Sequence, residues 1–119
     1  SLISENVFNA ADIIVVPLIP TTLSELTYEK LLKFFEKHDI NQSKIYTFFS
    51  MVESRKTLHQ DTMNKLLEEG GGNILDSRIP YRSDVEKMGI YREPVPVSSP
   101  HSDSTQAYQE LWGEIKAIL

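Results

Sequence analysis

The chain has 119 residues, 40% of them hydrophobic, a formal net charge of −5 and no cysteine; this fits one domain over residues 1–119 and excludes disulfides, thiolate metal sites and thiol nucleophiles. The acidic balance disfavours binding of a polyanion by the chain as a whole, because phosphate neutralisation needs clustered Lys and Arg. No apolar run approaches the roughly 20 residues that span a bilayer, and the start shows no secretory leader pattern, so we expect a cytoplasmic protein with no membrane partner.

A short helix followed by a strand is predicted at the start of the chain. Residues 4–11 favour the helix, and the β-branched run over residues 12–19 has the pattern of a strand buried on both faces. Pro17 cannot donate a ladder hydrogen bond. We therefore expect a bulge or an early end of this strand near Pro17 or Pro20.

A long helix should follow from Thr22. Thr22 and Glu25 have the spacing of a capping box, in which each side chain accepts a backbone N–H of the first turn. The helix should fade at residues 38–41. Apolar side chains at helical spacing predict its buried stripe, which consists of Leu23, Leu26, Leu31, Phe34 and Phe35.

A second strand and a second helix repeat this arrangement. Residues 44–52 are aromatic and β-branched, which predicts another buried strand. The following helix opens over residues 54–58, with Thr57 and Gln60 at capping-box spacing, and the three glycines at 70–72 should stop it. Its apolar side is predicted as Leu58, Met63, Leu66 and Leu67.

The third strand is predicted over residues 73–79. Pro80 fixes its own φ and pushes Ile79 towards an extended conformation, so the strand should end there. Residues 79–95 are then expected as a long non-strand loop, which is uncommon in a compact domain and usually functional. A final helix over residues 102–119 follows, with apolar side chains repeating at Tyr108, Leu111, Trp112, Ile115, Ile118 and Leu119.

The alternation of strands and helices predicts an α/β fold with a parallel sheet, right-handed crossovers and helices on its faces. Such a sheet places the carboxyl ends of its strands along one edge, where ligands bind. These ends are residues 20–22, 50–53 and 80–82. Met51 and Val52 are apolar and polarizable enough to line a flat aromatic base. Local features alone leave a binding edge and ordinary strand-to-helix turns as alternatives.

Motifs of the common catalytic sites are missing from the sequence. It contains no GxxxxGK[ST] phosphate-binding loop, no HExxH, and no His or carboxylate cluster at metal-ligand spacing. His38, His59 and His101 fall in different predicted elements, where surface or capping roles are expected. An independent hydrolase is disfavoured, because no nucleophile and base stand at a recognisable spacing.

Three segments, in order, resemble the carboxyl-terminal half of a ParA/MinD-type deviant-Walker ATPase, and together they span nearly the whole chain. They are SLISENVFNAADIIVVPLIPTTLSELTYEKL, FFSMVESRKTLHQD and IPYRSDVEKMGIYREPVPVSSPHSDSTQAYQELWGEI. The resemblance implies a partial three-layer αβα domain of the P-loop NTPase type. The amino-terminal half, with the P-loop, the catalytic aspartate and the Mg²⁺ ligands, would be absent, so we expect no ATP hydrolysis by these residues alone.

The resemblance also implies a function and a site. ParA-like ATPases bind ATP and Mg²⁺, form a nucleotide-sandwich homodimer and position DNA or other large cargo, and a partner protein that stimulates hydrolysis is expected. Met51 and Val52 would lie near the adenine, and Pro80, Tyr81 and Arg82 would form the loop that closes over it. Neither ATP nor Mg²⁺ is expected to bind tightly to these residues, and no catalytic residue is assigned.

Members of this family bind two further partners, DNA and membranes. Some ParA proteins place an arginine in the loop after Ile-Pro for DNA contact, whereas an ungapped comparison places Asp84 there, with Arg82 two residues earlier, so DNA binding stays open. MinD proteins bind membranes through a terminal amphipathic helix, but Glu110, Glu114 and a single Lys116 favour docking of the last helix to the core. The alternative function is a non-enzymatic α/β module that docks a partner protein.

Overall fold

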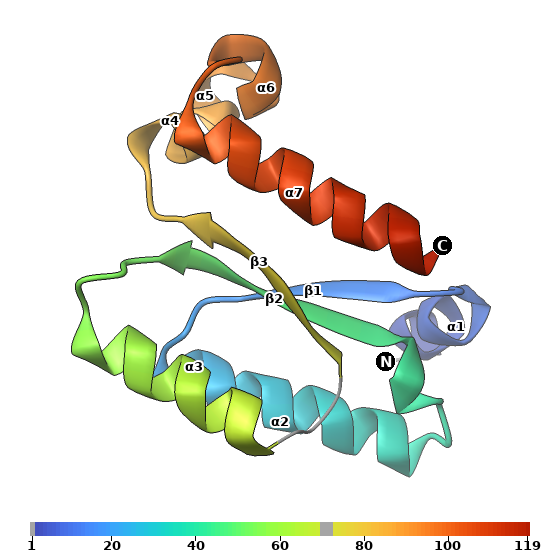
Figure 1. The fold of residues 1–119 in the computed structure, drawn as a ribbon. Helices are drawn as coiled ribbons and strands as arrows, with labels where there is room; N and C mark the ends of the chain where they lie inside the picture. The colour runs from blue at the N-terminus through green and yellow to red at the C-terminus, as the bar shows by residue number, and fades with distance from the viewer. Residues whose placement is uncertain (1, 70–72) are drawn as a thin grey trace.

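The computed structural model describes residues 2–69 and 73–119 and contains a three-stranded parallel sheet in the order β1-β2-β3 (Figure 1). The strands are β1 (Ile14–Leu18), β2 (Ile45–Val52) and β3 (Asn73–Pro80). Neighbouring parallel strands need a crossover, and the helices α2 (Thr22–Lys37) and α3 (Thr57–Glu69) lie in the two connections. The predicted α/β fold with a parallel sheet is confirmed.

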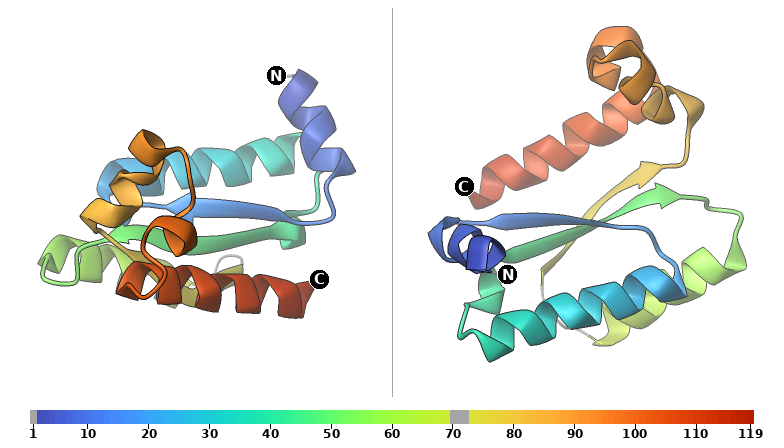
Figure 2. Two further views of the ribbon diagram at one scale, coloured as in Figure 1. Left: turned by 90° about the horizontal axis from the view of Figure 1, so that it is seen from above. Right: turned by 180° about the vertical axis from the view of Figure 1, so that it is seen from behind.

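Helices cover both faces of the sheet (Figures 1 and 2). α2 and α3 pack on one face, and α7 (Asp103–Ile118) packs on the other. Side chains alternate between the faces along a strand, so Phe49 packs against α2 and α3 while Phe48 packs against α7. Two apolar cores result. The first contains Leu18, Tyr28, Phe35, Ile40, Ile45, Phe49, Val52, Met63 and Leu66, and the second contains Phe48, Leu75, Ile79 and Leu111.

β1 is an edge strand. It pairs with β2 in an unbroken register from Ile14 to Leu18 and has no second neighbour in the described part of the chain. The predicted early end near Pro17 is confirmed, but burial on both faces is wrong, because Leu18 alone is buried in this strand. Pro17 is exposed, as an edge position allows for a residue without an N–H. An apolar groove of about 330 Å³ lies between β1 and α2.

α2 begins at Thr22, as predicted, but the residue that caps it differs from the prediction. Thr21 is the N-cap, and its Oγ1 accepts the N–H of Ser24 at 3.2 Å. Glu25 is buried, and its carboxylate forms an ion pair with Lys65 of α3 at 2.6 Å. The predicted capping box is therefore wrong, since Thr21 has the extended backbone that a cap needs.

The predicted apolar stripe of α2 is only partly buried. Phe35 is fully buried, whereas Leu23 and Leu26 are 76% and 51% exposed. The two other members, Leu31 and Phe34, are partly buried against the first core. Leu23 also lines the groove beside β1. The exposed apolar surface of α2 thus continues along the open edge of the sheet.

α3 begins at Thr57, which is a helical residue and not a cap. The Nε2 of Gln60 donates to the carbonyl of Ser54 at 3.3 Å, so the predicted capping box is wrong here as well. Two residues of the predicted apolar side, Met63 and Leu66, are buried. The other two, Leu58 and Leu67, are exposed. The predicted glycine stop at 70–72 lies outside the described residues.

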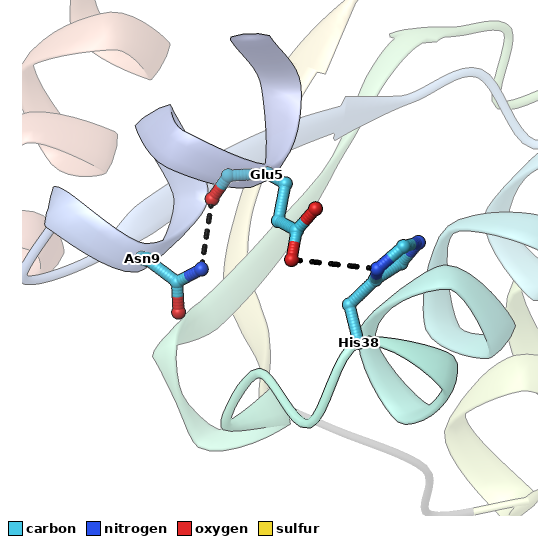
Figure 3. Close-up of polar contacts among 3 residues, drawn as sticks. All are labelled: Glu5, Asn9 and His38. Atoms are coloured by element: carbon cyan, nitrogen blue, oxygen red, sulfur yellow. Dashed lines mark hydrogen bonds and ion pairs between the residues drawn. The ribbon is translucent and has the colours of Figure 1, made fainter. Parts of the chain in front are cut away.

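α1 (Leu2–Ala10) confirms the predicted first helix and packs on the end of α2. The rings of Phe8 and Phe35 lie 5.0 Å apart between centroids. The ammonium of Lys44 donates to the last carbonyls of α1 at 3.0 and 3.3 Å, where the helix dipole favours a cation. The carboxylate of Glu5 lies 3.5 Å from Nδ1 of His38 (Figure 3). Ring contacts of Phe8 and polar contacts of Lys44 and Glu5 therefore hold α1.

α7 accepts hydrogen bonds from a bulge in β3. Between Ile74 and Arg78, β3 advances by four residues while β2 advances by two. The N–H groups of Asp76 and Ser77 donate to the carboxylate of Glu114 at 3.0 and 2.6 Å. A carboxylate from a helix thus supplies the acceptors that the interrupted ladder lacks.

β3 ends at Pro80, one residue later than predicted, and most of the expected loop is helical. Two one-turn helices, α4 (Ser83–Glu86) and α5 (Met88–Tyr91), lie within residues 79–95, and a third, α6 (Val95–Ser98), begins at the last residue of this range. Val95 is fully buried, and Oγ1 of Thr105 donates to the carbonyl of Ser99 at 2.6 Å, which ties the segment to α7. One-turn helices are too short for a periodic signal in the sequence, so the prediction of a loop was wrong.

α7 confirms the predicted last helix, with Ser102 as its N-cap. Leu111 is buried against the sheet, whereas Trp112 and Leu119 are exposed, so the predicted apolar face is wider than the buried one. Within residues 2–69 and 73–119, no helix has the length and apolar character needed to cross a membrane.

The open edge of β1 predicts self-association, because an unpaired strand beside exposed Leu23 and Leu26 favours contact with another copy. Sedimentation velocity should show a sedimentation coefficient that rises with protein concentration. Lysine at both positions should reduce this rise. Lysine at Leu58 and Leu67, two exposed leucines of α3, is the control and should not reduce it. A monomer at every concentration would contradict the prediction.

The contact of Glu114 with β3 predicts a pH-dependent stability. Burial acts to raise the pKa of this carboxyl, but hydrogen bonds from the Ser77 hydroxyl and from the N–H groups of Asp76 and Ser77 outweigh it and lower the pKa below its usual value. A lowered pKa in the folded state gives stability that is fully present above the unfolded-state pKa, about 4.3 for Glu. This stability is lost as the pH falls through the folded-state pKa.

Glu114→Gln should therefore lower the free energy of unfolding by about 1 kcal/mol at pH 7, because one charge-assisted acceptor is lost. Urea unfolding should show that the difference from the wild type shrinks once the pH falls below the folded-state pKa. Glu110→Gln is the matched control, since Glu110 is exposed on the same helix and its carboxylate accepts a hydrogen bond from the exposed Gln106. Equal losses in the two variants at pH 7 would argue against the prediction.

Candidate functional site

The carboxyl ends of β2 and β3 meet at one edge of the sheet. The N–H of Tyr81 donates to the carbonyl of Val52 at 3.0 Å, which fastens the chain after β3 to the end of β2. A hollow of about 370 Å³ lies at this point, and its walls are formed by Glu53, Ser54, Arg55, Tyr81 and Arg82. The hollow follows from the parallel topology, because the segments after neighbouring strands emerge side by side.

Two of the five predicted site residues, Tyr81 and Arg82, line the hollow. The other three do not line it. Val52 is buried in the core formed with α2 and α3, Met51 is half-buried, and Pro80 is the last residue of β3. The proposed role of these five residues in binding adenine stays a prediction.

Ser54 and Arg55 line the hollow but were not selected from the sequence. No sequence motif identifies these two residues. Their position directly after a buried strand is the one feature of the sequence that could have indicated them. The predicted strand end at 20–22 does not contribute to the hollow, and Thr21 from this segment caps α2. The structure thus brings together two of the three predicted strand ends.

Met51 has an unusual backbone conformation at the end of β2. Its φ is 52°, in the left-handed region that residues with a side chain rarely adopt. From Phe49 to Val52, β2 advances by three residues while β3 advances by two, so the pairing contains a bulge. The extra residue reverses the alternation, and Val52 therefore packs in the same core as Phe49. Strain of this kind is concentrated at functional sites, which supports a function for this strand end.

The charged groups at the hollow are partly engaged with one another. The ammonium of Lys56 lies 2.6 Å from the carboxylate of Glu53, and Nη1 of Arg82 donates to the carbonyl of Tyr81 at 3.1 Å. A hydrogen bond to the carboxylate of Glu86 raises the pKa of the Tyr81 hydroxyl. Tyr81 is therefore a neutral phenol at pH 7.

His59 is a buried histidine next to one wall of the hollow. It is 4% exposed, and its Nδ1 accepts the N–H of Glu53 at 3.1 Å. The predicted surface or capping role is confirmed for His59 as a capping role, because the buried ring satisfies a backbone donor just before α3. His38 lies at the end of α2, and His101 is exposed before α7.

Asp84 contacts α7. The hydroxyl of Ser104 donates to Asp84 Oδ1 at 2.7 Å, and this hydrogen bond lowers the pKa of the Asp84 carboxyl. Ser104 itself is buried. Asp84 therefore holds α4 against the start of α7.

Two side chains in the walls of the hollow, Tyr81 and Arg82, are of kinds that stack on flat aromatic rings. Tyr81 is 42% exposed, and phenol and guanidinium planes both stack on aromatic ligands. The neighbouring hydroxyl and carboxylate of Ser54 and Glu53 can bond to polar atoms at the ring edge. Among residues 2–69 and 73–119, no group of three or more His, Asp or Glu side chains is placed to hold a metal ion.

No protein-family model matches the sequence, and no curated protein matches it. The fold and the hollow therefore define the class of protein by themselves. The chain is an α/β domain with a parallel sheet and a ligand-sized hollow at the carboxyl ends of two neighbouring strands.

The left-handed backbone of Met51 predicts that a glycine variant at this position is more stable than an alanine variant, the reverse of the usual order in a strand. Met51→Gly should be more stable than Met51→Ala by about 1 kcal/mol, because a Cβ is disfavoured at positive φ. Ser50, the preceding residue of β2, is the control, and Ser50→Gly should be less stable than Ser50→Ala. Urea unfolding of the four variants measures both differences. A lower stability of glycine at both positions would contradict the prediction.

Proposed function

We propose that the chain is the adenine side of a ParA-like nucleotide-binding domain, from a cytoplasmic ATPase that positions DNA or other macromolecular cargo. The observation that carries the proposal is the hollow at the ends of β2 and β3, with Tyr81 and Arg82 in its wall. Ligands of open parallel sheets bind at the carboxyl ends of the strands. The order of elements agrees with the family pattern that the three sequence segments resemble.

Within this proposal, Tyr81 and Arg82 contact the base, and Glu53 and Ser54 face its polar edge. ATP, when bound with Mg²⁺, supplies the reactive phosphoanhydride. The residues that contact the phosphates and the metal belong to the remainder of the nucleotide-binding domain. Homodimer formation and a partner that stimulates hydrolysis are likewise properties of the whole ATPase.

The second candidate is a non-enzymatic α/β module that docks a partner protein. The open edge of β1 and the apolar groove beside it favour this function, because both offer surface for an added element. The two candidates place their ligand on different strands. A nucleotide should affect the ends of β2 and β3, whereas a docked protein should affect β1 and the start of α2.

Nucleotide binding to the ¹⁵N-labelled chain tests the proposal. Adenosine and ATP should both shift the amide signals of residues 53–55 and 81–82, with a Kd of about 1 mM or weaker, because the described residues supply no phosphate site. Tyr81→Ala should weaken binding about tenfold through the loss of base stacking. Tyr91→Ala is the matched control, since Tyr91 is exposed on α5 and lies outside the hollow.

Micromolar, magnesium-dependent binding of ATP to this chain would contradict the proposal that the phosphate and Mg²⁺ contacts belong to the remainder of the nucleotide-binding domain. Absence of any signal change at these five residues with both ligands would remove the nucleotide proposal. A titration by a protein partner that shifts only β1 and α2 would support the docking module instead.

A further inference from the structure

The turn between β2 and α3 is fastened by a histidine from inside the protein. The N–H of Glu53 donates to Nδ1 of His59 at 3.1 Å, and His59 is almost fully buried. One residue earlier, the carbonyl of Val52 accepts the N–H of Tyr81. The end of β2 is therefore bonded on one side to α3 and on the other to the segment after β3.

The direction of the histidine bond determines where the imidazole proton lies. A backbone N–H needs an unprotonated ring nitrogen as its acceptor, so Nδ1 carries no proton and Nε2 carries the single proton of a neutral ring. A second proton would convert Nδ1 into a donor that faces the N–H of Glu53. The hydrogen bond and the protonated form of His59 therefore exclude each other.

No ion pair with His59 is formed in the described part of the chain. The charged or titratable groups around the turn come from the turn itself, from the segment after β3 and from α4: Glu53, Arg55, Lys56, Tyr81, Arg82 and Glu86. The carboxylate of Glu53 is already paired with Lys56 at 2.6 Å. In the described part of the chain, no carboxylate lies at ion-pair distance from His59. A buried imidazolium would therefore stand without a counter-ion.

We propose that His59 is a positioning residue of the hollow and a pH-sensitive one. Neutral His59 holds the N–H of Glu53 in place, and protonation of His59 releases this N–H, while Gln60 still holds the carbonyl of Ser54. Glu53 forms one wall of the hollow together with Ser54 and Arg55, so acid loosens that wall at Glu53. The opposite wall stays bonded to β2 through Tyr81. The change concerns the protein itself and does not depend on which ligand the hollow binds.

NMR of the ¹⁵N-labelled 119-residue chain tests this inference without a ligand. At neutral pH, imidazole correlations should show a proton on Nε2 of His59 and none on Nδ1. As the pH is lowered, the amide shift of Glu53 should change together with the protonation of the His59 ring in the same spectra. The protection of this amide from hydrogen exchange, corrected for the intrinsic rate, should fall about tenfold over that titration.

Two variants separate the bond from general effects of acid. In His59→Asn, the side-chain oxygen keeps an acceptor near the place of Nδ1 and does not titrate, so the Glu53 amide should lose its pH dependence. In His101→Asn, an exposed histidine is removed and the Glu53 titration should remain as in the wild type.

A proton on Nδ1 at neutral pH would overturn the inference, and that measurement needs no substitution. A Glu53 amide signal that stays constant while the His59 ring titrates would also overturn it. The same holds if the titration of Glu53 persists unchanged in a folded His59→Asn variant.

Discussion

The rest of the structure depends on one constraint, the two register shifts in the pairing of β2 with β3. β3 has two extra residues in its middle, and β2 has one extra residue near its end. A bulge leaves backbone N–H groups without a ladder partner, and such groups need an acceptor when they are shielded from water. Glu114 supplies that acceptor for Asp76 and Ser77, so the bulge and the position of α7 are linked.

The second bulge, at Met51, affects the core and the hollow at the same time. It places Val52 in the core with Phe49, and it directs the following residues towards His59 and Tyr81. Burial of one large apolar side chain stabilises a protein by about 1.5–3 kcal/mol, and one hydrogen bond by about 0.5–1.5 kcal/mol. The apolar cores therefore provide most of the stability, whereas the few polar contacts select the register and the shape of the site.

Periodicity in the sequence was enough to predict the type and order of the main elements. Strands were recognisable from β-branched runs such as residues 44–52, and helices from apolar spacing. The cap of α2 was misplaced by one residue, because Thr21 and Thr22 carry the same side chain and only the backbone distinguishes them. The exposure of Leu23 could not be foreseen, since it depends on how far the sheet extends beside α2.

The site was harder to predict than the fold, for a physical reason. Met51 is left-handed without being glycine or asparagine, so no local preference reveals the bulge. His59 and Glu53 are six residues apart and meet only because the turn before α3 folds back. Tyr81 and Arg82 were found because they follow a strand directly. Their link to a nucleotide rests on the family resemblance and on the form of the hollow.

Pro17 determines which shape of strand could pair with the open edge of the sheet at β1. Neighbouring residues of a parallel strand direct their N–H and carbonyl groups to opposite sides, and proline at an edge turns its nitrogen outward. A strand added beside β1 would therefore find the carbonyl of Pro17 as an acceptor but no donor at that residue. One carbonyl of the incoming strand would stay without a partner. The edge thus accepts a strand that bends or takes up water opposite Pro17 more readily than a straight one.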